Sequence, residues 1–151
     1  TKNSPLPRLG ALMQDIENYL NFAEETGTVV VGAGKLGQAL LGYGGFDAYG
    51  LNILAAFDVN IKKPQVVDGK PLLPMEDLKD FCRDNKILMG IITVPAASAQ
   101  QVCDKVIDSG IKAIWNFAPC TLKIPAEIIL KQENLALSLA HLNNQLCKSF
   151  F

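Results

Sequence analysis

The chain has 151 residues, of which 49% are hydrophobic and 19% charged, and its formal net charge is −1. This apolar content is enough for the core of one folded domain and excludes a disordered tail. The weak charge excludes a domain that binds DNA by itself, and no run of about 20 apolar residues predicts a membrane span.

The N-terminus and the cysteines indicate the cellular compartment of the protein. It starts at Thr1, without an initiator Met or an apolar signal peptide, so we expect a piece of a longer protein in the cytoplasm. The cysteines form no CxxC pair and the only histidine is His141, so we predict reduced core thiols and neither a metal site nor a histidine-based catalytic triad. The four cysteines are Cys82, Cys103, Cys120 and Cys147.

Helical periodicity and apolar runs alternate along the chain. Residues 9–23 carry apolar side chains at helical spacing and predict an amphipathic helix. Apolar runs that predict strands, and the helical stretches after them, follow in turn. The strands are expected at 28–31, 52–57, 87–93, 111–115 and 127–131, and the helices at 36–43, 75–84, 96–109 and 134–148. Strands that are apolar on both faces and alternate with helices predict an α/β, doubly wound parallel sheet.

A glycine-rich loop follows the first strand directly. Residues 32–37 read Gly-Ala-Gly-Lys-Leu-Gly and open the next helix. In a dinucleotide site on such a sheet, Gly32 allows the tight turn, Gly34 lets the backbone approach a pyrophosphate, and Gly37 lets the helix pack close to the strand. The free amide groups of that helix would face the anion.

An acidic residue ends the second strand. Asp58 stands 21 residues after Gly37, where a ribose-binding carboxylate is expected. Its charge would repel a 2′-phosphate, which favours NAD over NADP. Lys62 and Lys63 could hold such a phosphate, but a solvated loop before Pro64 is the better interpretation.

Two further loops lie at the carboxyl ends of strands, where open α/β sheets bind their ligands. Residues 93–95 read Thr-Val-Pro, and residues 116–119 read Asn-Phe-Ala-Pro. Each proline would hold the backbone groups of its loop toward a ligand. Any strand-to-helix connection needs a residue that breaks regular structure, and from the pattern alone this explains the two prolines equally well.

Several segments together resemble the Rex family of redox-sensing transcriptional repressors. They are residues 32–41, Gly45-Phe46, 55–59, 90–96, Ala99-Gln100, 110–114 and 116–119, of which the last is the most specific. The resemblance covers the NAD(H)-binding half of such a repressor, a Rossmann domain also classed with CoA-binding domains. It implies domains at 1–27 (linker and connecting helix), 28–133 (Rossmann) and 134–151 (C-terminal helix). The winged-helix domain through which the family binds DNA is not within these residues.

The resemblance also implies the residues of an NAD(H) pocket. These are Gly32, Ala33, Gly34, Lys35, Leu36, Gly37, Asp58, Val59, Thr93, Val94, Pro95, Asn116, Phe117 and Ala118. In the family, a basic residue, a tyrosine and an aspartate exchange partners with the redox state of the cofactor. Lys35 and Tyr43 occupy the first two positions, whereas Ala136 replaces the aspartate and can accept no hydrogen bond through its side chain.

The last predicted helix carries a leucine stripe. Leu135, Leu139, Leu142 and Leu146 are spaced by 4, 3 and 4 residues, which is typical of a helix that packs on another helix. The stripe could close the domain's own core. In the family this helix crosses to the partner subunit, so we expect a homodimer.

Taken together, the residues predict a binding module and not an enzyme: the NAD(H)-binding, redox-sensing and dimerisation part of a Rex-like repressor. The alternatives are the NAD-binding domain of an oxidoreductase and a CoA-binding protein of the same superfold. Hydride transfer would need an acid or base beside the nicotinamide, and no histidine is placed for it. Asp58 suits a ribose diol and would clash with the 3′-phosphorylated nucleotide of CoA.

Overall fold

A computed structural model describes residues 27–133 and 135–150, with side chains at 27–133 and 139–149. The predicted helix at 9–23, and with it the linker at 1–27 except Gly27, lies outside the described residues. So do the side chains of Leu135 and Ala136.

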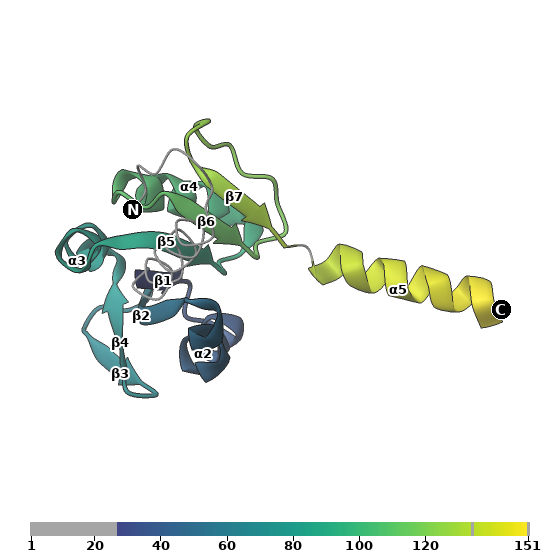
Figure 1. Cartoon of the computed structure of the whole chain (residues 1–151), viewed down its shortest axis with the longest axis horizontal. Coiled ribbons are helices and arrows are strands. Elements are labelled where there is room, and N and C mark those ends of the chain that lie inside the picture. Colours follow the sequence, from purple (N-terminus) through teal and green to yellow (C-terminus); the bar gives the residue numbers. More distant parts are fainter. Residues whose placement is uncertain (1–26, 134, 151) are drawn as a thin grey trace, which may run out of the picture.

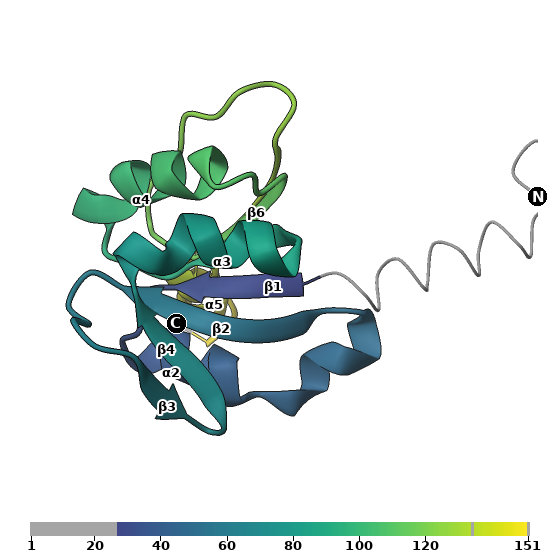
Figure 2. The same cartoon turned by 90° about the vertical axis from the view of Figure 1, so that its left-hand side faces the viewer.

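The described elements form one seven-stranded sheet with helices on both faces (Figures 1 and 2). In chain order they are β1 (Gly27–Val31), α2 (Lys35–Gly42), η1 (Gly44–Tyr49), β2 (Asn52–Asp58), β3 (Gln65–Val67), β4 (Lys70–Pro74), η2 (Met75–Asp77), α3 (Leu78–Asn85), β5 (Ile87–Ile92), α4 (Ala96–Asp108), β6 (Ala113–Asn116), β7 (Ile129–Gln132) and α5 (Leu135–Phe150). The α/β doubly wound class is confirmed.

The strand order is β3-β4-β2-β1-β5-β6-β7, and every pairing is parallel except that of β3 with β4. Among the described residues, the sheet begins in the middle at β1, continues outward through β2 to the β3–β4 hairpin at one edge, and returns to the other side of β1 at β5. The connections therefore diverge between β1 and β5. Ligands of open α/β sheets bind at such a switch point, outside the carboxyl ends of the strands.

The core has one layer on each face of the sheet because consecutive strand residues point to opposite sides. Val29 and Val31 pack toward α3 and α4, whereas Val30 packs with Leu41 of α2. The three valines are 0% exposed, and such a side chain contributes about 1.5–3 kcal/mol when it is fully buried. β1 is therefore the rigid base from which the glycine loop extends.

The strand boundaries differ from the sequence prediction in a few places. β6 begins at Ala113 instead of residue 111, because Gly110 turns at φ +95° and Ile111 is buried before the strand starts. β7 begins at Ile129 instead of 127, after a turn in which the amide of Ile128 donates to the carbonyl of Pro125. The other predicted elements agree to within two residues, except that the predicted helix 75–84 starts as the 3-10 turn η2.

The β3–β4 hairpin and η1 were not predicted. Asp68 and Gly69 form the hairpin turn with φ +52° and +79°, the left-handed pair that a tight two-residue turn requires. Pro71 and Pro74 in β4 argue against a strand. The sheet tolerates them because each is paired on one side only, Pro71 with β3 and Pro74 with β2.

The prediction of core thiols holds for two of the four cysteines. Cys82 and Cys103 are buried, and desolvation raises the pKa of each thiol to about 11. For Cys103, the charge of Asp104 adds to this effect. Cys120 is half-buried and Cys147 is exposed on α5, so the prediction is wrong for Cys147.

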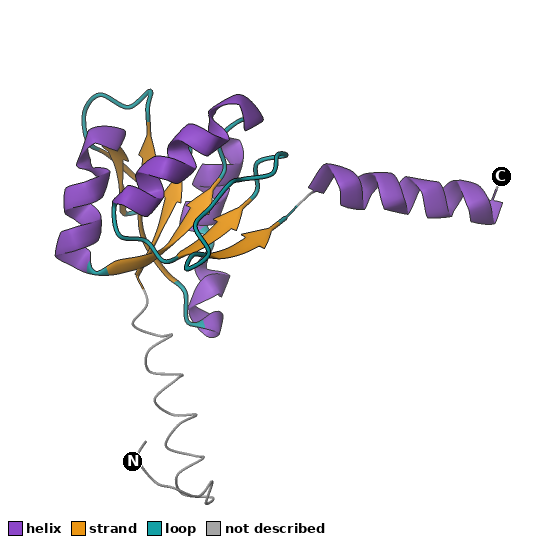
Figure 3. Cartoon of the chain, turned by 90° about the horizontal axis from the view of Figure 1, so that it is seen from above, coloured by secondary structure: helices purple, strands orange, loops and turns teal. Residues whose placement is uncertain are grey.

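Helix α5 extends away from the sheet and its layers (Figures 1 and 3). Leu139, Leu142 and Leu146 on it are 67%, 62% and 49% exposed. These three leucines therefore do not close the core formed by the described residues. No helix among the described residues is both long and apolar enough to cross a membrane.

Candidate functional site

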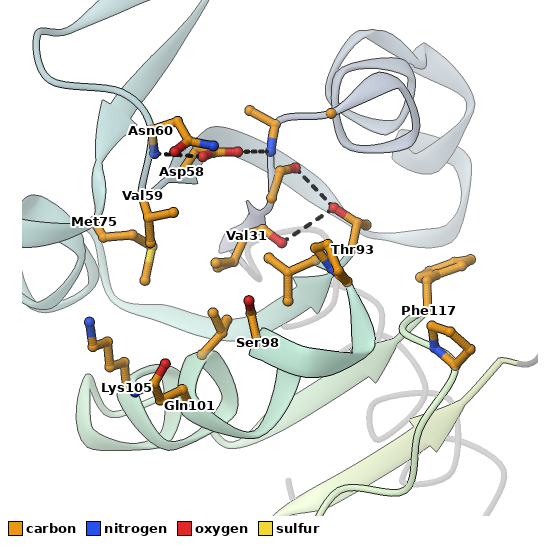
Figure 4. A pocket seen from close by; sticks show the side chains of 17 residues that line it. Val31, Asp58, Val59, Asn60, Met75, Thr93, Ser98, Gln101, Lys105 and Phe117 are labelled. Carbon is orange, nitrogen blue, oxygen red and sulfur yellow. Dashed lines mark hydrogen bonds between the residues drawn. The ribbon is translucent and has the colours of Figure 1, made fainter.

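A cavity of about 640 Å³ opens at the switch point, where the loops after β1, β2, β5 and β6 meet the side of α4 (Figure 4). It is lined by Val31, Gly32, Ala33, Gly34, Asp58, Val59, Asn60, Met75, Thr93, Val94, Pro95, Ser98, Gln101, Val102, Lys105, Phe117 and Pro119. The only charged residues in this lining are Asp58 and Lys105. The cavity is thus a mostly neutral cleft with one carboxylate and one ammonium group.

Two glycines of the loop are required by the fold itself. Gly32 has φ +113°, and a Cβ there would collide with the hydroxyl of Thr93. A Cβ on Gly37 would overlap the carbonyl oxygen of Gly32. These glycines let α2 start directly against the end of β1, whatever the cavity holds.

Gly34 is different because nothing in the described chain requires it to be a glycine. It has φ −73°, which any residue adopts, and a Cβ built on it meets no atom within 4 Å. It is the N-cap of α2, where no side chain caps the helix and no acidic residue lies in the first turn. The free amides of a helix N-terminus attract an anion, and a bare backbone lets that anion approach.

Asp58 has two hydrogen bonds within the chain. Its Oδ2 accepts from the amide of Ala33 at 2.7 Å, and its Oδ1 accepts from the amide of Asn60 at 2.8 Å (Figure 4). The carboxylate thus joins the end of β2 to the glycine loop. Each oxygen keeps lone-pair capacity for a hydroxyl donor in the cavity.

Thr93 fixes the loop from the other side. Its hydroxyl shares its single proton between the carbonyl oxygen of Gly32 at 2.9 Å and that of Val31 at 3.3 Å. On the opposite side of the loop, Gln38 donates from Nε2 to the carbonyl of Ala33 at 2.8 Å. The glycine loop is therefore held in shape before any ligand arrives.

Phe117 lies on the far side of the cavity from Asp58 (Figure 4). Its ring packs on Trp115 with the centroids 4.8 Å apart, and Trp115 in turn meets Phe46 at 6.0 Å. Tyr43 packs edge-on against Phe46 at 5.0 Å and does not line the cavity. This end of the cavity is apolar and carries no charge.

Most of the predicted pocket residues come together here, and five do not line the cavity. Lys35, Leu36 and Gly37 lie beyond it on α2, and Asn116 and Ala118 are buried behind its wall. Asn116 uses its side chain within the protein, where its Oδ1 accepts from the amide of Ala118 at 3.0 Å.

Sequence reasoning missed the wall that α4 contributes. Ser98, Gln101, Val102 and Lys105 recur at spacings of 3, 1 and 3 residues, which places them on one face of the helix. That periodicity is visible in the sequence. The direction of the face depends on how α4 packs on the sheet. Asn60, Met75 and Pro119 also line the cavity and were not predicted.

Comparison with known proteins places this fold and site in a class. Residues 23–120 match the family model described as CoA binding domain, so the chain belongs to that class of Rossmann-like nucleotide-binding domains. The redox-sensing transcriptional repressor Rex of Clostridium perfringens (strain SM101 / Type A) is 39% identical over 128 residues, which are 84% of this chain and 59% of that protein. Rex of Thermoanaerobacter sp. (strain X514) is 36% identical over 135 residues, 85% of this chain and 58% of that protein.

Solved structures give the same result. RSP, a Rex-family repressor, superimposes with a TM-score of 0.78 at 32% identity, covering 97% of this chain and 71% of RSP. RSP in complex with β-NADH has the same TM-score at 33% identity, with 94% and 69% covered. The chain belongs to the Rex family, and it spans about three fifths of the length of the curated relatives it matches.

Proposed function

We propose that this chain is the NAD(H)-binding, redox-sensing and dimerisation module of a Rex-like transcriptional repressor. The observation that carries the proposal concerns Gly34. The packing of the described residues does not require a glycine at this position, and the absence of a side chain leaves the N-terminus of α2 open to the cavity. The related structure of RSP with β-NADH supports the choice of ligand.

The proposed dinucleotide would lie along the cavity from Asp58 to Phe117. Its pyrophosphate would meet the backbone at Gly34, and the adenosine ribose would donate to the Asp58 carboxylate. The adenine would lie toward the apolar side chains of Val59 and Met75, and the nicotinamide toward Phe117. The pocket residues predicted from the sequence remain part of this proposal.

NAD(H) suits the cavity better than the two phosphorylated alternatives, NADP(H) and CoA. Asp58 would repel a phosphate on the adenosine ribose. Neither Lys62 nor Lys63 lines the cavity, so neither offers a cation for that phosphate in the described structure. Lys105, the one cation in the lining, comes from α4.

Replacing Asp58 tests the ribose contact. We expect Asp58→Ala to weaken NADH binding by about 1.5–3 kcal/mol, the range for a hydrogen bond to a charged group. Discrimination against NADPH should shrink in the same variant because the repelling charge is gone. Fluorescence titration with both nucleotides measures the two effects. Asp80→Ala, which removes an exposed carboxylate on α3, is the matched control. Unchanged NADH affinity in a folded Asp58→Ala protein would refute the contact.

We also propose that the module forms a homodimer through α5. Three exposed leucines on a helix that extends from the sheet make an apolar surface, and a second copy offers the same surface by symmetry. Burying a fully exposed leucine contributes about 1.5–3 kcal/mol, and these partly covered side chains would contribute a corresponding fraction each to the dimer.

A charge within this stripe tests the interface. Leu142→Glu should convert the dimer to a monomer in sedimentation analysis, because a carboxylate would be buried without a partner. Asn144→Glu places the same charge on the same helix outside the leucine stripe and should leave the dimer intact. A Leu142→Glu chain that still dimerises as wild type would show that α5 is not the interface.

Operator DNA is the proposed target of the whole repressor. The structure of RSP with β-NAD⁺ and operator DNA supports this part of the proposal. With a net charge of −1, these 151 residues carry no excess of positive charge to neutralise DNA phosphates. We therefore assign DNA contact to parts of the protein beyond them.

The module would work in the cytoplasm and without catalysis. The titratable side chains in the cavity lining are Asp58 and Lys105, and Asp58 already accepts two backbone hydrogen bonds. His141 lies on α5, outside the cavity. The Rex relatives are described as transcriptional repressors, which supports a sensing role over hydride transfer.

A further inference from the structure

The loop after β6 forms one wall of the cavity and lies beside the segment that enters α5. We call residues 117–120 the wall loop; it supplies Phe117 and Pro119 to the cavity lining. β7 ends at Gln132, and α5 starts at Leu135. β6 and β7 are paired neighbours, and Asn116 stands opposite Gln132 in their register.

Asn116 connects these two segments from inside the protein. It is 0% exposed, yet its amide group is fully used. The two hydrogens of its Nδ2 are shared among three acceptors: the carbonyls of Ala118 and Cys120, each at 3.3 Å, and Oε1 of Gln132 at 3.1 Å. A buried amide with this many partners has one orientation, so it fixes the wall loop and Gln132 relative to each other.

Gln132 completes the connection. Its Nε2 donates to the carbonyl of Ala118 at 3.2 Å, so the side chains of Asn116 and Gln132 share that acceptor and also bond to each other. The backbone follows the same path, since the amide of Glu133 donates to the carbonyl of Asn116 at 2.9 Å. Trp115, which packs on Phe117, lies 3.4 Å from Glu133 through its indole nitrogen.

The wall loop and residues 132–133, which precede α5, are therefore tied together by side-chain and backbone bonds. A ligand that shifts Phe117 or Pro119 must either break these amide bonds or carry residues 132–133 with it. The Asn116 amide is buried and costly to leave without partners, so the two segments are expected to move as a unit.

We propose that Asn116 and Gln132 are positioning residues that couple nucleotide binding in the cavity to the pairing of α5 between two copies. This rests on the proposed function, which supplies both the nucleotide and the dimer. Coupling of two binding events is reciprocal: NADH changes the dimer dissociation constant by the same factor by which dimerisation changes NADH affinity.

Gln132→Met tests the coupling because it removes both side-chain bonds at an exposed position without emptying the core. The dimer dissociation constant is measured by sedimentation with and without saturating NADH. In the wild-type chain NADH should change this constant on the order of tenfold. In Gln132→Met the ratio should fall to about 1 while NADH still binds. Gln132→Glu, which keeps the oxygen that accepts from Asn116, should retain more of the ratio than Gln132→Met.

Gln65→Met is the matched control, since it makes the same change on the edge strand β3, away from the cavity, and should keep the wild-type ratio. A wild-type chain that binds NADH and dimerises with a ratio of 1 would overturn the coupling. So would a Gln132→Met chain with the full wild-type ratio. A wild-type chain that fails to bind NADH or to dimerise would instead refute the proposed function itself, and the coupling with it.

Discussion

Gly34→Val should abolish NADH binding and leave the sheet folded. Nothing lies within 4 Å of a Cβ at this position, and the backbone there suits any residue, so the native chain accommodates the valine. The new side chain would occupy the space in front of the helix N-terminus, where the pyrophosphate is proposed to lie. We expect a loss of affinity on the order of a hundredfold or more, which corresponds to about 2.7 kcal/mol.

NADH fluorescence titration measures the affinity, and thermal unfolding followed by circular dichroism reports the fold. Gly44→Val is the matched control, because a Cβ on Gly44 also meets no atom within 4 Å and Gly44 does not line the cavity. Gly37→Val should instead destabilise the protein, since its side chain would overlap the carbonyl of Gly32. Wild-type affinity in a folded Gly34→Val protein would place the pyrophosphate elsewhere.

NADH should bind more tightly than NAD⁺, by up to about a hundredfold or 2.7 kcal/mol. The nicotinamide of NAD⁺ carries a positive charge that NADH lacks. In the proposed pose this ring lies toward Phe117, whereas the only carboxylate in the lining, Asp58, is on the far side of the cavity. Bringing a cation into an apolar site costs desolvation energy that nothing there offsets.

Two variants test whether Phe117 causes the preference for NADH over NAD⁺. Phe117→Ala should shrink the ratio of the two affinities because water would reach the ring. Tyr43→Phe should leave the ratio nearly unchanged, because Tyr43 packs on Phe46, is 56% exposed and does not line the cavity. Isothermal titration with each nucleotide gives both dissociation constants. Equal affinities in the wild-type chain would mean that the domain holds the nucleotide without sensing its redox state.

The glycine loop and Asp58 could be predicted from the sequence because their geometry follows from short-range rules. The first strand, the tight turn after it and the first residues of the next helix all lie within about ten residues of sequence. The spacing from the glycine loop to Asp58 then follows from the length of that helix and of the second strand. Gly32, Gly34 and Asp58 all line one cavity in the structure.

Side-chain direction was harder to predict. Asn116 and Phe117 are adjacent, and the family resemblance implied that both belong to the pocket, but neighbouring residues at the end of a strand point to opposite faces. Ile114 on the same strand is buried toward α3 and α4, which could have indicated that Asn116 also points inward. Its contacts with Gln132 depend on the pairing of β6 with β7, which no local pattern specifies.

The wall of the cavity formed by α4 was missed for a related reason. Ser98, Gln101 and Lys105 read as ordinary polar residues of an exposed helix, and only the packing of α4 on the sheet turns them toward the cavity. The leucine stripe of α5 was visible in the sequence, whereas its separation from the core depends on the path of the chain after β7.

The most direct test of the account is calorimetric titration of the unmodified chain with NADH and, in parallel, with CoA. Both ligands contain an adenine nucleotide with a pyrophosphate, so both could use the helix N-terminus at Gly34. Only CoA carries a phosphate on the ribose that would face the carboxylate of Asp58. The account predicts saturable binding of NADH and no saturable heat with CoA at the same concentrations. Binding of CoA as tight as or tighter than that of NADH would contradict it.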